Sequence, residues 1–116
     1  MMNILGNIEW IADLIPELEV RKTRFEVDTD EVDDELVEVF VDELRRLSGE
    51  LREGLLNADL EMIRMAAHSI KGMGGTIGLP ELSVLGLEIE NIAKENRLID
   101  ARPMIMALED WIAKLD

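Results

Sequence analysis

The stretch LVEVFVDELRRLSGELREGL, residues 36–55, carries an apolar residue at every third or fourth position. This apolar stripe consists of Leu36, Phe40, Leu44, Leu47, Leu51 and Leu55. Residues three or four positions apart share one face of an α-helix, so the stretch predicts a long amphipathic helix that ends near Gly54. Asp28, Thr29 or Asp30 is suited to cap its start, because a short polar side chain accepts a hydrogen bond from a free backbone N–H.

Three more helices are predicted along the rest of the chain. The first is capped by Asn57 or Asp59. Its inward face consists of Leu60, Ile63, Ala67, Ile70 and Met73 or Gly74. Gly78 and Pro80 separate it from the next helix, since glycine suits a helix end and proline a first turn. The stripe of that helix is Leu82, Leu85, Ile89 and Ile92. A last helix starts within Asp100–Pro103. It carries Met104, Leu108, Trp111 and Leu115.

Residues 1–27 predict a separate N-terminal segment. Its apolar residues recur at helical spacing and are Ile4, Ile8, Ile11, Leu14 or Ile15, and Leu18. Pro16 interrupts this pattern, so we expect a short helix followed by a turn or irregular segment through Arg21–Val27. Because the loops between the four later helices are short, neighbouring helices should run antiparallel. The prediction is an all-α, up-and-down antiparallel four-helix bundle over residues 28–116, with an extra N-terminal helical segment.

Composition excludes several classes of function. The chain has 116 residues, enough for one domain, and no cysteine, which excludes disulfides and thiolate metal sites. Its 26 acidic and 12 basic residues give a net charge of −14, which repels nucleic acid and anionic membranes. There is no apolar run of about 18 residues and no signal-peptide pattern, so we expect a cytoplasmic protein that binds neither nucleic acid nor membrane.

The chemistry is expected in the stretch AHSIKGMGGTIG, residues 67–78. On a helix, Arg64, His68, Lys71, Gly72 and Gly75 share one face, opposite the apolar stripe. His68 is the only histidine in the chain and should therefore point to solvent, where a neutral imidazole has one nitrogen free as a nucleophile. Lys71 is positioned to meet anionic oxygens on that nitrogen, and the two glycines leave the approach open.

Each of these residues also has an ordinary structural interpretation. A lone surface histidine is usually a solvated side chain, Lys71 is a common kind of helix cation, and glycines often mark a fraying helix end. The joint pattern favours function: one histidine, a cation three residues later, and glycines four and seven residues later. Each glycine inside a helix lowers stability by about 0.5–1 kcal/mol relative to alanine. A role as a simple spacer does not explain several glycines in so short a stretch.

The pattern Ala-His-Ser-Ile-Lys-Gly-x-x-Gly-x-x-Gly resembles the signature of histidine-containing phosphotransfer (HPt) domains. It is especially similar to those of chemotaxis histidine kinases and hybrid sensor kinases, and the similarity is sharpest over residues 66–92. The resemblance implies that His68 is phosphorylated, that Lys71 contacts the phosphoryl group, and that Gly72 keeps the approach open. Gly75 matches the next glycine of the pattern and is expected at the partner-binding surface.

The resemblance to the chemotaxis version points to one more residue. In that version a Glu-Asn pair follows 22 residues after the histidine, and here this pair is Glu90-Asn91. The resemblance implies that Glu90 accepts a hydrogen bond from one ring nitrogen of His68 and orients the other nitrogen for attack. The alternative is that Glu90 is a solvated helix acid. Arg64 and Met65, beside the histidine, are candidates for contact with a partner.

The resemblance implies a phosphoryl carrier in a His–Asp phosphorelay, whose partners are a response-regulator receiver domain, a histidine kinase or both. The receiver would supply the phosphoaspartate and Mg²⁺, and the chain itself would need no cofactor. It contains neither a P-loop nor a kinase glycine loop, so we expect a carrier that cannot phosphorylate itself from ATP. A metal site is not expected, because one histidine and no cysteine leave only carboxylates as ligands.

Two alternatives stay open at this point. The chain could be the phosphotransfer domain of a chemotaxis-type kinase that its own kinase domain phosphorylates, or an inert helical interaction module in which the His-Lys-Gly pattern is accidental. The Met start and the apparently complete last helix mildly favour a free-standing protein. A monomer is expected, since one bundle uses up the apolar stripes. The kinase, the receiver, the pathway and the direction of phosphoryl flow are not specified by the sequence.

Overall fold

The computed structural model describes residues 8–26 and 34–115, and all the regular structure in these residues is helical. The elements are α1 (Trp10–Leu14), α2 (Leu18–Arg21), the 3₁₀-helix η2 (Lys22–Phe25), α3 (Asp34–Asn57), α4 (Leu60–Gly74), the 3₁₀-helix η3 (Gly75–Ile77), α5 (Pro80–Lys94) and α6 (Leu98–Ala113). No helix in the described residues is long and apolar enough to span a bilayer.

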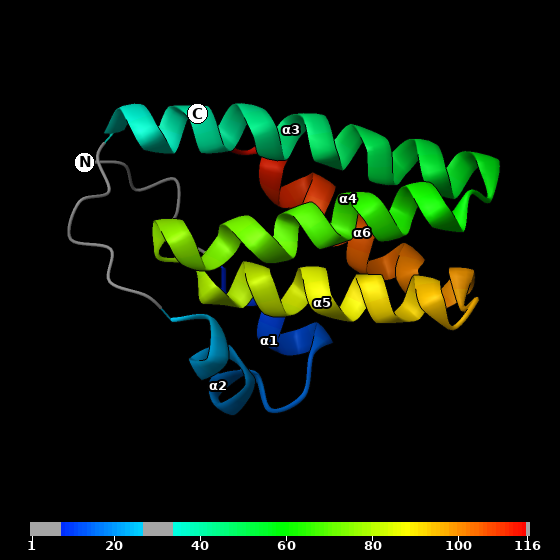
Figure 1. Ribbon diagram of the computed structural model, residues 1–116, viewed down its shortest axis with the longest axis horizontal. Helices are drawn as coiled ribbons and strands as arrows, with labels where there is room; N and C mark the ends of the chain where they lie inside the picture. Colours follow the sequence, from blue (N-terminus) through cyan, green and yellow to red (C-terminus); the bar gives the residue numbers. More distant parts are fainter. Residues whose placement is uncertain (1–7, 27–33, 116) are drawn as a thin grey trace.

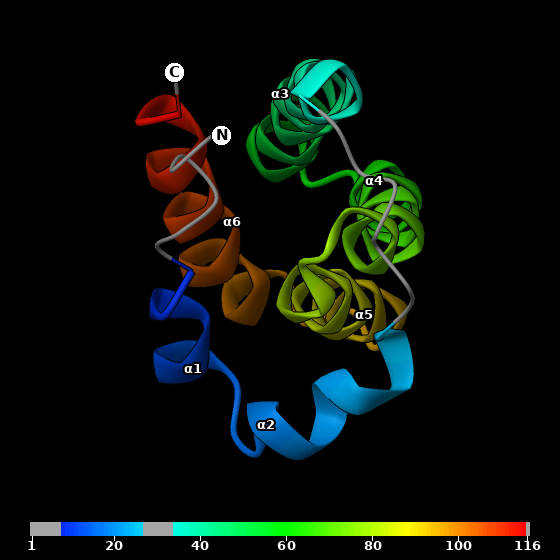
Figure 2. The ribbon, with the colours of Figure 1, turned by 90° about the vertical axis from the view of Figure 1, so that its left-hand side faces the viewer.

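Helices α3, α4, α5 and α6 form a bundle around one apolar core. Figure 1 shows α4 and α5 side by side along the long axis, with α6 behind them and α3 along one edge. Figure 2 looks along the helices and shows the four arranged around a common centre, so that α3 neighbours both α4 and α6. Successive helices run antiparallel because short connections join them. The predicted all-α bundle is confirmed.

The long amphipathic helix is present as α3, and its core face includes four of the six stripe residues. These are Phe40, Leu44, Leu47 and Leu51. Leu36 is 43% exposed, while Val37 and Val41 are buried in the core. The predicted end near Gly54 is wrong, because α3 continues to Asn57. A Cβ at Gly54 would lie 2.6 Å from Cγ1 of Ile63, so this glycine serves close packing against α4. The predicted caps at Asp28–Asp30 lie outside the described residues.

The predicted boundary between α4 and α5 and the cap of α4 agree with the structure, whereas the predicted start of the last helix does not. The Asp59 side chain accepts a hydrogen bond from the backbone N–H of Met62 and caps α4. Gly78 has a φ of 87°, a left-handed conformation that glycine adopts without strain, and Pro80 opens α5. Helix α6 starts slightly earlier than predicted, at Leu98, and includes Pro103 in its first turns.

The N-terminal segment packs against the bundle and contributes to its core. Ile11, Ile15 and Leu18 are at most 5% exposed. In Figure 2, α1 lies beside α6, and α2 lies beside α5. The prediction of a turn or irregular segment through Arg21–Val27 is wrong for residues 21–25, because α2 continues into η2, and Val27 lies outside the described residues. Two ion pairs, Arg21 to Glu88 at 2.8 Å and Lys22 to Glu81 at 3.1 Å, attach this segment to α5.

Candidate functional site

His68 lies on the solvent face of α4, as the helical periodicity predicts. Its side chain is 62% exposed, whereas Ala67 and Ile70 on either side are buried in the core. The Asp59 cap and the burial of Ile63 fix the rotation of α4 about its axis. The imidazole is therefore held outward by the packing of its own helix, where another protein can reach it.

Glu90, on α5, provides the main polar contact of the histidine. Its Oε2 atom lies 2.9 Å from Nδ1 of His68, and its Oε1 atom lies 2.9 Å from Nζ of Lys71. Nζ of Lys94 lies 3.8 Å from Oε2. Glu90 is only 2% exposed, in contrast to a solvated helix acid. One buried carboxylate thus connects the histidine with two lysines from two helices.

Gly86, which the sequence analysis did not single out, allows α4 and α5 to approach closely enough for this contact. A Cβ at Gly86 would lie 2.6 Å from the backbone nitrogen of Lys71 and 2.8 Å from the carbonyl oxygen of Ala67. Glu90 is one helical turn further along α5, so its carboxylate is brought within hydrogen-bonding distance of Nδ1 of His68. Glycine inside an otherwise continuous helical pattern was the available sequence signal for this close packing.

Electrostatics define the protonation state of Glu90. Burial raises the pKa of Glu90, but the hydrogen bonds from Lys71 and His68 and the charges of Lys71 and Lys94 lower it more, so the pKa lies below its usual value. Glu90 is therefore ionised at neutral pH and can only accept hydrogen bonds. Nδ1 of a neutral His68 must then carry the ring proton, and Nε2 has a free lone pair.

The surface beside His68 is open at Gly72. An added Cβ at this position would meet no atom within 4 Å, and Gly72 is exposed one helical turn after the histidine. No side chain at this position therefore stands between solvent and the imidazole. The same turn carries Lys71, whose side chain is 26% exposed and whose ammonium is turned toward Glu90.

The prediction that Gly75 shares this exposed face is wrong. Helix α4 ends at Gly74 and Gly75 opens the 3₁₀-helix η3, but the backbone at both residues is right-handed helical, so it is the cover by the N-terminal segment that removes Gly75 from the exposed face. Gly75 is buried, and an added Cβ would lie 2.1 Å from the carbonyl oxygen of Phe25. Its N–H donates a hydrogen bond of 2.9 Å to Oγ of Ser83. Gly75 therefore accommodates the N-terminal segment and is not available to a partner.

Arg64 and Met65 lie one turn before His68. Met65 is 57% exposed, and it contributes an apolar surface beside the histidine. Arg64 is partly exposed, and its guanidinium donates a hydrogen bond of 3.0 Å to Glu61. A second cation at the site, Lys94, was missed by sequence reasoning because it belongs to α5, where only the position of Glu90 was marked by the resemblance.

No group of three or more metal-ligating side chains occurs within residues 8–26 and 34–115. The buried Glu90 has two ammonium groups and an imidazole as its neighbours. The site consists of an exposed imidazole nucleophile with a buried carboxylate behind it and two cations beside it.

Comparison with known protein families assigns the chain to one family. The Hpt domain family matches residues 35–116, which contain α4, α5 and the whole site described above. Searches among curated proteins and among solved structures gave no match. Since the family match covers most of the chain, the protein belongs to the Hpt domain family, whose function is histidine phosphotransfer in the phosphorelays of two-component signal transduction. Hpt domains interact with histidine kinases and receiver domains.

Proposed function

We propose that His68 is the residue of this Hpt domain that carries the phosphoryl group, and that the group is attached to Nε2. The observation that supports this most strongly is the 2.9 Å contact between Nδ1 of His68 and the buried carboxylate of Glu90. This contact occupies one ring nitrogen and directs the lone pair of the other away from the bundle. No other histidine is present in the sequence to carry the group.

The proposed step is a direct displacement at phosphorus. Nε2 attacks the phosphorus atom of a phosphoaspartate, the N–P bond forms, and the bond between phosphorus and the aspartate oxygen breaks. The aspartate leaves with the electron pair as a carboxylate. The imidazole ring becomes positively charged, and the negative charge of Glu90 stabilises it through the Nδ1–H hydrogen bond. The reverse step returns the phosphoryl group to an aspartate.

Lys71 and Lys94 are the groups proposed to balance the charge of the phosphoryl oxygens. Both ammonium groups lie close to Glu90, at 2.9 and 3.8 Å, and both side chains are partly solvent-exposed. When a dianionic phosphoryl group is attached to Nε2, either lysine can turn from the Glu90 carboxylate toward it. Their flexible stems make this a rotation of side chains alone.

The partner proposed for this exchange is a receiver domain of a response regulator, with its own aspartate and Mg²⁺. The open surface at Gly72 and the exposed Met65 support docking of a second protein over the histidine. Methionine adapts its shape to different partners, which suits a carrier that exchanges with more than one protein. One copy of the chain contains the histidine, carboxylate and lysines, so we propose that a monomer is active.

Phosphoryl transfer from a phosphorylated receiver domain to the purified chain tests this function. The wild type should acquire an acid-labile, alkali-stable label, and His68→Gln should acquire none. Ser69→Ala is a matched control, because Ser69 is the exposed neighbour of His68 on α4. The Ser69→Ala protein should acquire the same label as the wild type. Label that persists in His68→Gln would place the phosphoryl group on another residue and contradict the proposal.

The two alternatives give different outcomes in the same assay. If receivers fail and the kinase domain of a chemotaxis-type kinase labels the chain in the presence of ATP, the protein is a direct kinase substrate. Absence of label from both sources would leave a helical interaction module. ATP alone, without any partner, should give no label.

A further inference from the structure

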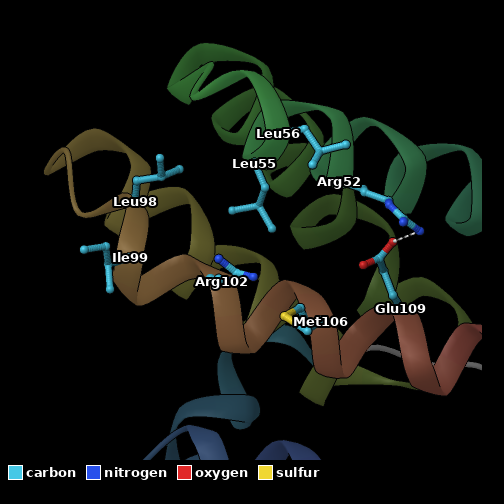
Figure 3. Close-up of a pocket in the computed structure, with 8 residues that line it drawn as sticks. All are labelled: Arg52, Leu55, Leu56, Leu98, Ile99, Arg102, Met106 and Glu109. Carbon is cyan, nitrogen blue, oxygen red and sulfur yellow. Dashed lines mark ion pairs between the residues drawn. The ribbon is translucent and has the colours of Figure 1, made fainter.

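A second surface of the protein, unrelated to His68, has the character of a binding groove. It lies between the C-terminal part of α3 and the first three turns of α6, and Figure 3 shows its lining side chains. The cavity has a volume of about 430 Å³. Its lining residues are Arg52, Leu55, Leu56, Leu98, Ile99, Arg102, Met106 and Glu109. We call this surface the α3–α6 groove.

The α3–α6 groove exposes large apolar side chains that the bundle does not use. Ile99 is 84% exposed, Leu56 77% and Met106 48%. In Figure 3 the side chains of Leu55 and Leu56 extend from α3 on the opposite side of the groove from Ile99 and Met106 of α6. Such a group of exposed apolar residues from two helices, with charged residues beside it, is typical of a protein interaction site.

The openness of the α3–α6 groove favours a protein segment over a small molecule. Sites for small ligands are usually enclosed and bury most of the ligand surface. Here two of the apolar side chains, Leu56 and Ile99, are each more than three-quarters exposed at the lips. A helix lying along the groove would cover the exposed side chains on both of its edges at once, as in the helix-in-groove mode of peptide recognition.

The charge of the α3–α6 groove differs from that of the whole chain. The chain has a net charge of −14, yet the groove has two arginines and one glutamate. Arg52 forms a loose ion pair with Glu109, at 3.7 Å. Arg102 forms no ion pair with any residue in the described part of the chain and extends into the groove in Figure 3. An acidic side chain on the occupant would pair with it.

The α3–α6 groove is on the face of the bundle away from the phosphotransfer site. His68 and Glu90 belong to α4 and α5, which lie at the front in Figure 1, whereas α6 lies behind them. Figure 2 shows α4 and α6 on opposite sides of the core. A protein bound to the groove would therefore leave His68 accessible to a receiver or kinase.

We propose that the α3–α6 groove docks an amphipathic helix of another protein, whose apolar face packs on Leu56, Ile99 and Met106 and whose acidic residues pair with Arg102 and Arg52. The contact anchors the carrier to a partner while phosphoryl transfer takes place on the opposite face. Anchoring of this kind raises the effective concentration of the transfer partner without touching the reactive histidine.

Two synthetic peptides test this proposal with the full chain. Both are blocked helices of about 15 residues, roughly 22 Å long, with leucines along one face. One peptide carries glutamates beside the leucines and the other carries lysines at the same positions. Binding is followed by changes in the backbone amide NMR signals of the protein. The glutamate peptide should perturb residues of α3 and α6 around the groove and leave the signals around His68 unchanged.

The peptide pair distinguishes local from global charge. If the two arginines direct binding, the glutamate peptide binds more tightly, by roughly twofold to fivefold for each exposed ion pair. If the overall charge of −14 dominates, the lysine peptide binds more tightly and at many places, which would overturn the proposal. Sedimentation shows whether the chain covers the groove with a second copy of itself, a result that would also overturn it.

Variants with matched controls complete the test. Ile99→Ser should abolish binding of the glutamate peptide, whereas Val39→Ser, which changes an apolar residue of α3 that is 61% exposed, should not. Arg102→Glu on α6 should reverse the preference between the two peptides, whereas Arg46→Glu, the same charge change on α3 outside the groove, should not. All four variants should accept phosphoryl groups like the wild type from an isolated receiver domain that has no docking helix, so loss of docking is separable from loss of transfer.

Discussion

Glu90 shows how one buried charge is stabilised in this protein. An ionised carboxylate that is 2% exposed is costly unless donors surround it, and here Nδ1 of His68 and the ammonium groups of Lys71 and Lys94 do so. The chain contains 26 acidic residues, and composition alone does not distinguish this one. The spacing from His68 marked it by resemblance, but its burial depends on the packing of α5 against α4.

Removal of the Glu90 charge should slow phosphoryl transfer. In Glu90→Gln the amide can still occupy the space, but it no longer fixes the Nδ1–H tautomer or stabilises the charged ring. We expect the rate of transfer from a phosphorylated receiver to fall by roughly 10- to 100-fold, the usual cost of losing such a supporting group. The NMR signals of the His68 ring should show a mixture of tautomers. An unchanged rate with a single tautomer would contradict the role given to Glu90.

The same variant should reveal a pH-dependent contribution to stability. The pKa of Glu90 is lowered in the folded chain, so the unfolded chain binds a proton at a higher pH than the folded one. The stability advantage of the wild type over Glu90→Gln should therefore be complete above the ordinary glutamate pKa of about 4.3. It should disappear as the pH falls through the lowered value.

Chemical denaturation of both proteins at several pH values measures this difference, and we expect about 1–2 kcal/mol near neutral pH. Because the other carboxylates are common to both proteins, their titration largely cancels. A difference that stays constant as the pH is lowered would show that the Glu90 charge does not stabilise the fold.

At the scale of helices, the site depends on the close contact of α4 and α5 at Gly86. A Cβ at Gly86 would clash with the backbone of Lys71 and Ala67, whereas a Cβ at Gly72 would extend into open space. The two glycines lie on neighbouring helices, and their surroundings give opposite expectations for substitution by alanine. Gly49, in the middle of α3, also faces open space and provides a control far from the site.

We therefore expect Gly86→Ala to destabilise the protein by about 1–3 kcal/mol and to slow transfer, because α5 must move away from α4 and take Glu90 with it. Gly72→Ala and Gly49→Ala should each stabilise the protein by about 0.5–1 kcal/mol through helix propensity. Denaturant unfolding and the transfer assay measure both quantities. Equal effects of Gly86→Ala and Gly49→Ala would contradict the close-contact explanation.

The glycine-rich end of α4 illustrates what the sequence could predict. The helix pattern and the exposed faces of His68 and Gly72 follow from a period of 3.6 residues, and both predictions agree with the structure. Gly75 could not be placed in this way, because the position is covered by the backbone of Phe25. The covering residue lies 50 positions earlier in the chain, and periodicity carries no information about such a contact.

At the scale of the whole molecule, residues 8–26 complete the bundle. Ile11 and Ile15 are at most 1% exposed, and the rings of Trp10 and Trp111 lie 6.1 Å apart, between α1 and α6. The helical spacing of Ile11 and Ile15 predicted a short helix. It could not predict the core that they join, because the ion pairs and apolar contacts that hold this segment are made with α5 and α6.

This arrangement predicts that the N-terminal segment and the bundle unfold together. The two tryptophans, one in α1 and one in α6, report on that contact by fluorescence, while circular dichroism reports on the helices. The two signals should change at the same denaturant concentration in a single transition. Ile11→Ala should shift both midpoints downward, with a loss of about 2–5 kcal/mol. A fluorescence change that clearly precedes the loss of helix would show that residues 8–26 fold independently of the bundle.

The most direct test of the account is to locate the phosphoryl group within the histidine ring. The protein is phosphorylated by a receiver domain, and nitrogen and phosphorus NMR of the His68 side chain identify the bonded nitrogen. We predict a bond from phosphorus to Nε2, with Nδ1 still protonated and hydrogen-bonded to Glu90. A phosphoryl group on Nδ1, or on any residue other than His68, would contradict the account.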